Sequence, residues 1–341
     1  MRTKQTKKRL RTVRRHRLAL ALAGVMAMPA ALAQSLPSGG SVVGGGANAT
    51  ISYSGNNATI NQSAQGAIIN WGSFSIGTGY GVTFNQPNAQ SVTLNRVIGF
   101  GYGISPSSID GTLTSNGTVF LINTAGITFG GGAAINVGGL IASTINMTDA
   151  DFNAGVASRN FAFNAGGSTA DITNYADITA AAGGTVAFLA QNITNFGDIS
   201  APGGTVAFGA ANAATITLDP FGDGLTQLTI TQPAAADQGQ IRNYYNTISA
   251  DGGQILMRAA NAPGGDDAAM IVSTGTLRAQ STASRAGRIE LTAEGGTVLV
   301  GGFPDGFEPG TIDVSGGSYA GGDVVISAAT VGLLADATET S

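Results

Sequence analysis

The chain has 341 residues, with 16 Lys plus Arg against 20 Asp plus Glu, and only 11% of its residues are charged. Gly accounts for 52 residues and Cys for none, and the apolar fraction of 43% is too high for a disordered chain. Because Gly and β-branched residues are poor helix formers, this composition excludes a mainly helical protein and predicts many short strands joined by tight turns.

The first 33 residues differ from the rest. Residues 1–17 hold nine Lys or Arg and no acidic residue, and residues 18–28 form the apolar run LALALAGVMAM. Ala31-Leu32-Ala33 then supplies a small-x-small cleavage pattern. Together these features predict a secretory signal peptide over residues 1–33. An anchoring helix is the alternative, but the apolar run is shorter than the roughly 20 residues that span a membrane.

Removal of that segment leaves an acidic chain. Seven basic residues remain, all of them Arg, so the net charge is 7 − 20 = −13. A nucleic-acid partner is therefore not expected, because phosphate binding needs a basic face. The only histidine, His16, lies in the predicted signal. Without His or Cys, residues 34–341 cannot form the usual zinc sites or catalytic triads, and we expect no metal, no cofactor and no disulfide.

Short alternating runs follow the signal. Residues 49–62, ATISYSGNNATINQ, contain two such runs around a turn and predict a hairpin. Within residues 91–144, T-V-F-L-I and G-I-T-F predict strands joined by tight corners. Residues 148–163 break this pattern, which indicates a loop or short helix leaving the strand array. Residues 217–237 form a second break, where we expect an inserted hairpin.

From residue 172 the sequence repeats with a period near 20 residues. Each copy combines a short strand, an aromatic step, a Gly turn and a second strand. The copies are residues 172–192, 193–212 and 241–261, with looser versions at 271–294 and 311–328. This period without helices predicts a β-solenoid, whose stacked coils bury one continuous core. Asn174, Asn195 and Asn243 occupy equivalent places, so we expect an asparagine ladder.

Five motifs in a defined order resemble a known family. They are G-A-I-I-N-W at 66–71, L-N-R-V at 94–97, G-T-V-F-L-I-N at 117–123, G-I-T-F-G at 126–130 and V-G-G-L-I-A-S-T at 137–144. This set resembles the N-terminal secretion domain of two-partner-secreted exoproteins of the filamentous haemagglutinin type. We place that domain at residues 34–219. Residues 220–341 would continue the β-helix repeats and end in a polar tail over 331–341.

The resemblance implies an all-β fold, namely a right-handed parallel β-helix with an N-terminal cap and extra-helical hairpins. It also implies export through the periplasm of a Gram-negative bacterium and recognition by the periplasmic domains of an outer-membrane β-barrel transporter. The product would be secreted or held at the cell surface. The family is mostly adhesins and haemagglutinins, with some cytolysins and contact-dependent toxins. We therefore expect a monomeric, non-enzymatic adhesin with a host-cell or carbohydrate receptor.

The resemblance also indicates a candidate secretion-recognition motif. The family often has Asn-Pro-Asn-Gly where this chain has Asn123-Thr124-Ala125-Gly126, and a second family motif, Asn-Pro-Asn-Leu, is not found. Loss of the Pro-Asn pair changes the turn chemistry. Asn95 and Arg96 of L-N-R-V complete the candidate set. For Asn123 and Gly126 the alternative is a purely structural corner.

Arg96 also has simpler interpretations than recognition. As the one basic residue in this part of the chain, it could pair with a carboxylate such as Asp110 or point into solvent, and the sequence favours solvent.

Two pairs of carboxylates leave an enzymatic function as an alternative. Asp149/Asp151 and Asp266/Asp267 could serve as acid and base in a polysaccharide-acting β-helix enzyme. Both pairs lie in breaks of the repeat, which favours solvated loop acids. Calcium could bind at residues 262–267, but the repeated G-G-x-G-x-D pattern is absent. A structural surface protein is a further alternative to the adhesin.

Overall fold

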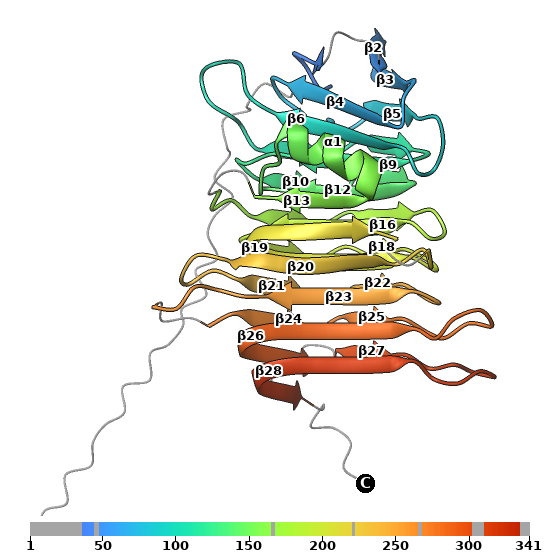
Figure 1. The fold of residues 1–341 in the computed structure, drawn as a ribbon, viewed down its shortest axis with the longest axis vertical. Helices are drawn as coiled ribbons and strands as arrows, with labels where there is room; N and C mark the ends of the chain where they lie inside the picture. Colours follow the sequence, from blue (N-terminus) through green and yellow to red (C-terminus); the bar gives the residue numbers. More distant parts are fainter. Residues whose placement is uncertain are drawn as a thin grey trace, which may run out of the picture. The chain divides into compact units, whose positions relative to one another are not determined.

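The computed structural model describes residues 36–43, 48–164, 168–219, 222–264, 268–301 and 310–334, which belong to one compact unit. The predicted signal peptide and Asp266/Asp267 lie outside these residues. Successive coils lie one above the other (Figure 1), and the strand pairings form three parallel ladders, which we call faces 1 to 3. The expected parallel β-helix is therefore confirmed. None of the helices in the described part has the length and apolar character to cross a membrane.

Each face is a parallel ladder that gains one strand per coil. Face 1 contains β3 (Asn57–Gln62), β5 (Gly81–Asn85), β8 (Thr112–Ser115), β11 (Ala134–Val137), β15 (Asp177–Ala180), β18 (Ile199–Ser200), β22 (Thr247–Ser249), β25 (Thr276–Arg278) and β27 (Thr311–Asp313). Face 2 contains β4 (Gly66–Trp71), β6 (Val92–Val97), β9 (Thr118–Ile122), β12 (Gly139–Ser143), β16 (Thr185–Ala190), β19 (Thr205–Leu218), β23 (Gln254–Ala259), β26 (Arg288–Gly301) and β28 (Asp323–Leu334). Face 3 contains β7 (Ser107–Ile109), β10 (Ile127–Phe129), β14 (Ile172–Asn174), β17 (Asn192–Asn195), β21 (Gln240–Asn243), β24 (Met270–Ser273) and the second halves of β26 and β28.

The N-terminal end is capped by antiparallel strands. β1 (Ser41–Val42) pairs with β4, and β2 (Ala49–Ser54) pairs with β3 as the predicted hairpin. Trp71 and Phe74 lie beneath this cap in an edge-to-face contact at 5.5 Å, and both are buried. The cap replaces the preceding coil that the first rung lacks.

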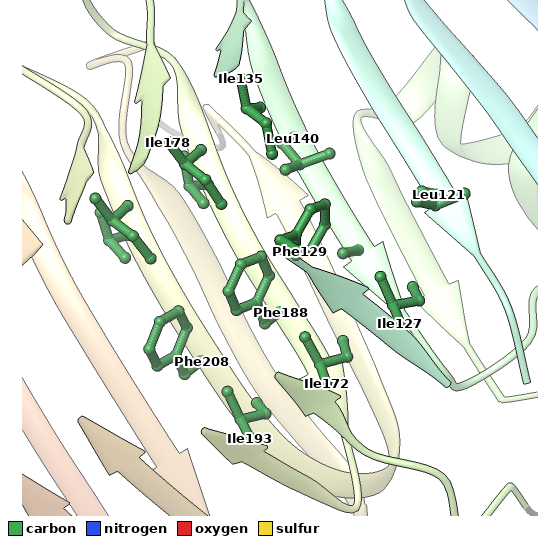
Figure 2. Packing of buried hydrophobic residues seen from close by; sticks show 14 of the residues in the cluster. Leu121, Ile127, Phe129, Ile135, Leu140, Ile172, Ile178, Phe188, Ile193 and Phe208 are labelled. Carbon is green, nitrogen blue, oxygen red and sulfur yellow. The ribbon is translucent and has the colours of Figure 1, made fainter. Parts of the chain in front are cut away.

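The core runs along the inside of all coils because alternate residues of every strand point inward. Phe188 and Phe208 stack in register on face 2 with ring centroids 5.1 Å apart, and Phe129 of face 3 stacks on Phe188 at 5.6 Å inside the coil (Figure 2). Ile127, Ile172 and Ile193 form a parallel row on face 3. Parallel pairing places equivalent residues of each repeat against one another, so the repeat becomes a continuous core.

A polar ladder accompanies this core at the corner after face 3. The side-chain amide of Asn174 donates to Asn195 at 2.7 Å, and Asn195 donates to Asn243 at 2.8 Å. Asn243 in turn donates to the Ser273 hydroxyl at 3.2 Å. All four side chains are fully buried, so these bonds satisfy groups that water cannot reach. The predicted asparagine ladder is confirmed, with a serine at its end.

A second apolar layer covers the outside of face 2. It is built by α1 (Asp149–Ser158), β13 (Asn160–Phe163) and a hairpin of the distal half of β19 with β20 (Thr226–Pro233). These elements lie in front of face 2 in Figure 1 and bury a second cluster that includes Phe120 and Phe161. Both predicted breaks therefore leave the coil and pack back onto it.

The first residues of the expected polar tail form a strand. Residues 331–334 continue β28 by pairing with β26, and residues 335–341 lie outside the described part. The strand continues because its backbone completes the ladder of face 3.

Candidate functional site

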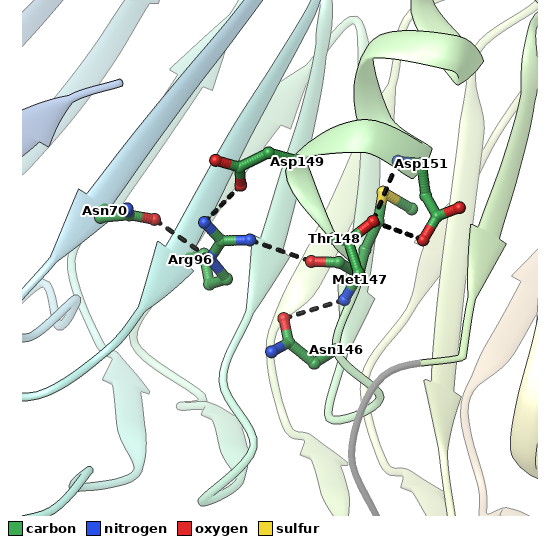
Figure 3. Close-up of polar contacts among 7 residues, drawn as sticks. All are labelled: Asn70, Arg96, Asn146, Met147, Thr148, Asp149 and Asp151. Atoms are coloured by element: carbon green, nitrogen blue, oxygen red, sulfur yellow. Dashed lines mark hydrogen bonds and ion pairs between the residues drawn. The ribbon is translucent and has the colours of Figure 1, made fainter. Parts of the chain in front are cut away.

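Arg96 joins face 2 to the helix that covers it. Its guanidinium donates to the Asn70 amide oxygen at 3.0 Å, to the Met147 carbonyl at 2.9 Å and to Asp149 at 2.5 Å (Figure 3). The Arg96 side chain is 12% exposed. The expectation of solvent exposure or pairing with Asp110 is wrong, because α1 places an acceptor and a carboxylate above β6. Asp110 instead accepts a bond from the Ser108 hydroxyl at 2.6 Å.

The first carboxylate pair has a structural role at the start of α1. Thr148 is the N-cap residue, and its hydroxyl accepts from the Asp151 backbone N–H at 3.1 Å. The same hydroxyl donates to the Asp151 carboxylate at 2.6 Å, while Asp149 pairs with Arg96 (Figure 3). Both acids lie in the first turn, where the helix dipole favours negative charge. These contacts account for the two carboxylates as a helix cap rather than an acid–base pair.

Asn95 is the neighbour of Arg96 in sequence but points to the opposite side of the strand. Its side chain is fully buried, and its oxygen accepts from the Trp71 indole N–H at 3.0 Å. Its amide donates to the Phe120 carbonyl at 3.3 Å. Asn95 thus satisfies the polar edge of the capped tryptophan inside the coil.

The turn at residues 123–126 joins β9 to β10. The Asn123 side chain is fully buried and donates at 2.9 Å both to the Ser105 carbonyl and to the Ser107 hydroxyl. Its oxygen accepts from the Ala125 N–H at 2.9 Å, which closes a local turn. Gly126 has φ +119°, a conformation that favours glycine. Thr124 and Ala125 are only partly buried, so the altered pair is the part of the turn that another molecule could contact.

The six candidate residues do not converge on one cluster. Asn95 points into the core, Arg96 points outward beneath α1, and Asn123 fills the corner beside the chain at 105–107. Each instead holds a different element in place, which residue spacing alone does not reveal.

Sequence reasoning missed an exposed loop beside this turn. Residues 98–106 connect β6 to β7, and Ile98, Phe100, Tyr102 and Ile104 are all exposed. The alternation of Gly with large apolar residues, I-G-F-G-Y-G-I, was the available signal.

A short aromatic stack lies outside the asparagine ladder. The rings of Tyr175 and Phe196 stack at 5.0 Å with an interplanar angle of 2°, and Phe196 stacks on Tyr244 at 5.3 Å. Because each ring covers the face of the next, this stack stabilises the corner of successive coils.

A charged pocket lies where the covering hairpin ends. The pocket has a volume of about 470 Å³ and is lined by residues that include Leu228, Arg258, Arg288 and Glu290. Glu290 forms ion pairs with Arg258 and with Arg288, the latter at 2.9 Å. Burial raises the pKa of Glu290, but the hydrogen bond from Arg288 and the charges of both arginines outweigh it and hold the pKa below its usual value.

Comparison with known proteins identifies the family. The sequence profile of the TPS secretion domain matches residues 33–291, which is most of the chain. The chain belongs to the two-partner secretion (TPS) family. TPS exoproteins are exported through the periplasm of Gram-negative bacteria to the cell surface or the medium, and the family implies an outer-membrane transporter as partner.

Three known proteins resemble this chain to different extents. The TPS chain is 42% identical over 117 residues to the heme/hemopexin-binding protein of Haemophilus influenzae, covering 34% of this chain but only 12% of that protein. It resembles the HMW1 secretion domain of Haemophilus influenzae with a TM-score of 0.60 and 28% identity, covering 85% of this chain and 87% of that one. The filamentous hemagglutinin secretion domain aligns with a TM-score of 0.40 at 14% identity, over 87% and 96% of the two chains.

Proposed function

We propose that this TPS chain is the export-directing part of a secreted exoprotein and that its folded or folding coils are read by the periplasmic domains of a dedicated outer-membrane transporter. The observation that carries the proposal is the profile match over residues 33–291. Residues 1–33 would act as the signal peptide that first delivers the chain to the periplasm. The division between a secretion domain at 34–219 and further repeats at 220–341 is part of the same proposal.

Within this domain we assign the recognition role to the turn at 123–126. Thr124 and Ala125 provide the accessible backbone and side chains, whereas Asn123 and Gly126 hold the turn in shape. Asn95 and Arg96 contribute indirectly, because they fix the strand that precedes the neighbouring loop and the helix above it. This division of roles follows from burial, since a fully buried side chain cannot contact a transporter while the coil is folded.

We further propose that the exported protein is a monomeric adhesin without catalytic activity, with a host-cell or carbohydrate receptor. Among the residues that the structure describes, Asp177 and Asp198 stack on successive rungs, and each accepts a backbone N–H from the next rung, at 3.3 and 2.6 Å. The following position in this row is Thr247. A row of two engaged carboxylates favours a structural ladder over the clustered acids of a polysaccharide-acting enzyme.

The name of the Haemophilus relative suggests heme binding as an alternative function. Residues 34–341 contain no His and no Cys, which are the common protein ligands of heme iron. The matched region is also only 12% of that relative. We therefore favour the export role for this region over heme binding.

Export can be tested by expressing the whole chain with and without its partner transporter and measuring the amount in the medium. We expect release only with the transporter. Equal amounts in both cultures would refute the proposal. Asn123→Ala should reduce release, because it removes the bonds to residues 105 and 107, while Asn136→Ala, at an exposed position of β11, should not.

A further inference from the structure

The loop between β6 and β7 concentrates exposed apolar side chains. Ile98, Phe100, Tyr102 and Ile104 are 53%, 58%, 101% and 36% exposed. Soluble proteins rarely gather large apolar residues on one short exposed segment unless the segment contacts another molecule. The residues between them are Gly99, Gly101 and Gly103, all with positive φ.

The backbone gives this loop a defined shape. A Cβ on Gly99 would lie 2.2 Å from the Gly103 carbonyl oxygen, so the neck of the loop closes where only glycine fits. The Phe100 ring lies against Gly72, whose added Cβ would be 2.2 Å from that ring. The loop is therefore seated on the capped end of the coil through Phe100. Tyr102 stands at the apex.

The loop is also tied to the candidate recognition turn. The Asn123 amide donates to the Ser105 carbonyl at the end of the loop and to the Ser107 hydroxyl just beyond it. The accessible residues Thr124 and Ala125 thus belong to a turn that is hydrogen-bonded to the base of the loop. One contacting molecule could engage both.

The lack of basic residues around the loop favours a protein over a lipid surface as the contacting molecule. Residues 98–109 carry no charged side chain, and residues 34–341 contain no Lys. Interfacial membrane binding by a short apolar segment usually relies on neighbouring basic residues that attract anionic lipid. A compact Phe–Tyr pair is instead typical of anchors that fill an apolar pocket on a protein.

We propose that Phe100 and Tyr102 form an aromatic anchor that inserts into an apolar pocket on the periplasmic domains of the partner transporter. This inference rests on the proposed function, because it assumes that those domains read this region of the chain. Tyr102 supplies most of the new buried surface, and Phe100 orients the loop and adds its exposed edge.

Binding of the purified chain to the soluble periplasmic domains of its transporter tests the anchor, for example by biolayer interferometry. Tyr102→Ser should weaken binding by about tenfold or more, as expected for a contact-dominating aromatic residue. Because Tyr102 is fully exposed, its replacement should leave the circular dichroism spectrum and unfolding midpoint unchanged. Tyr319→Ser is the matched control, since Tyr319 is 54% exposed on a distant coil.

The outcomes separate this inference from the proposed function. Unchanged binding by Tyr102→Ser, with the original chain still bound and exported, overturns the anchor alone. A chain that neither binds the periplasmic domains nor needs the transporter overturns the proposed function as well. Flotation with phosphatidylethanolamine–phosphatidylglycerol vesicles, or dimerisation in sedimentation, that is lost in Tyr102→Ser while transporter binding persists would assign the loop to lipid or to a second copy and overturn the anchor.

Discussion

Some coils of face 2 are covered by α1, β13 and the β19–β20 hairpin, and the later coils are not. The two groups of coils differ in the side chains on the outer side of the sheet. From β9 onward the inward residues are apolar in both groups of coils, whereas one outward row changes from apolar to charged where the covering layer ends. In register it reads Ile68, Leu94, Phe120, Ile141, Ala187, Ala207, Leu256, Glu290 and Val325. The row is apolar as far as Leu256 and then reaches the ion-paired Glu290. The inward pattern therefore encodes the coil, and the outward pattern encodes what packs upon it.

The close approach of the cover is visible in residue size as well. At Gly209 of β19, an added Cβ would lie 2.8 Å from Leu189 and 3.3 Å from Leu228 of the covering hairpin. The next residue in that row is Arg258, which lies beyond the hairpin and lines the charged pocket. Small outward residues on face 2 therefore allow the hairpin to pack closely, and charged outward residues occur where the hairpin ends.

The largest effect should come from removing an aromatic ring beneath the cover. Phe120 contacts the rings of Phe152 and Phe161 at 5.8 and 4.8 Å, so Phe120→Ala should destabilise the fold by about 3–5 kcal/mol. Val325→Ala, at the same register on an uncovered coil, should change stability by less than about 0.5 kcal/mol. The measurement is the urea unfolding midpoint. Equal shifts would contradict the distinction between the two regions.

The next largest loss of stability should come from the asparagine ladder, because it links successive coils whether or not they are covered. Asn195→Ala removes the shared member of two buried bonds, and we expect a loss of about 2 kcal/mol. Thermal unfolding followed by circular dichroism measures it, with the exposed Asn136→Ala as control. A midpoint no lower than that of the control would show that the ladder contributes little.

A smaller, local effect is expected at the joint between cover and coil. Arg96→Met removes two bonds to the start of α1 and one to Asn70 of β4, and we expect a loss of about 1–2 kcal/mol because Asp149 is 41% exposed and can rehydrate. Hydrogen exchange should accelerate in residues 149–158. Arg242→Met on face 3 should leave exchange in α1 unchanged, and unchanged exchange in both variants would refute the role of Arg96.

The smallest effect is a pH dependence on the uncovered coils. The lowered pKa of Glu290 means that the folded state holds fewer protons than the unfolded one, so this contribution is present above about pH 4.5 and is lost as pH falls through the folded-state pKa. Glu290→Gln should flatten the acid limb of stability by less than about 1 kcal/mol. The exposed Glu294→Gln should retain it.

The sequence predicted the features that repeat or that depend on local chemistry. Equivalent Asn174, Asn195 and Asn243 revealed the ladder, and the turn within residues 49–62 revealed the hairpin. The partner of Arg96 was not predictable, because Asp149 is 53 residues away and reaches it only after α1 folds back.

The outer layer was also hidden from sequence reasoning. In Thr118–Ile122 every residue is buried, so periodicity could not tell the outward Phe120 from the inward Leu121. The roles of residues 123–126 in recognition stay predictions, since their burial and contacts explain the shape of the turn but do not identify a molecule that binds it.

The asparagine ladder has a further consequence because its amides all point the same way. Each side-chain N–H₂ group faces the oxygen of the next coil, from Asn174 through Asn195 to Asn243, and the chain of donors ends on the Ser273 hydroxyl. Bonds aligned in this way polarise one another in a low-dielectric interior. The row therefore carries a net electric dipole along the axis of the coils. If the Asn195 amide were flipped, its N–H₂ group would face that of Asn174 and its oxygen would face that of Asn243.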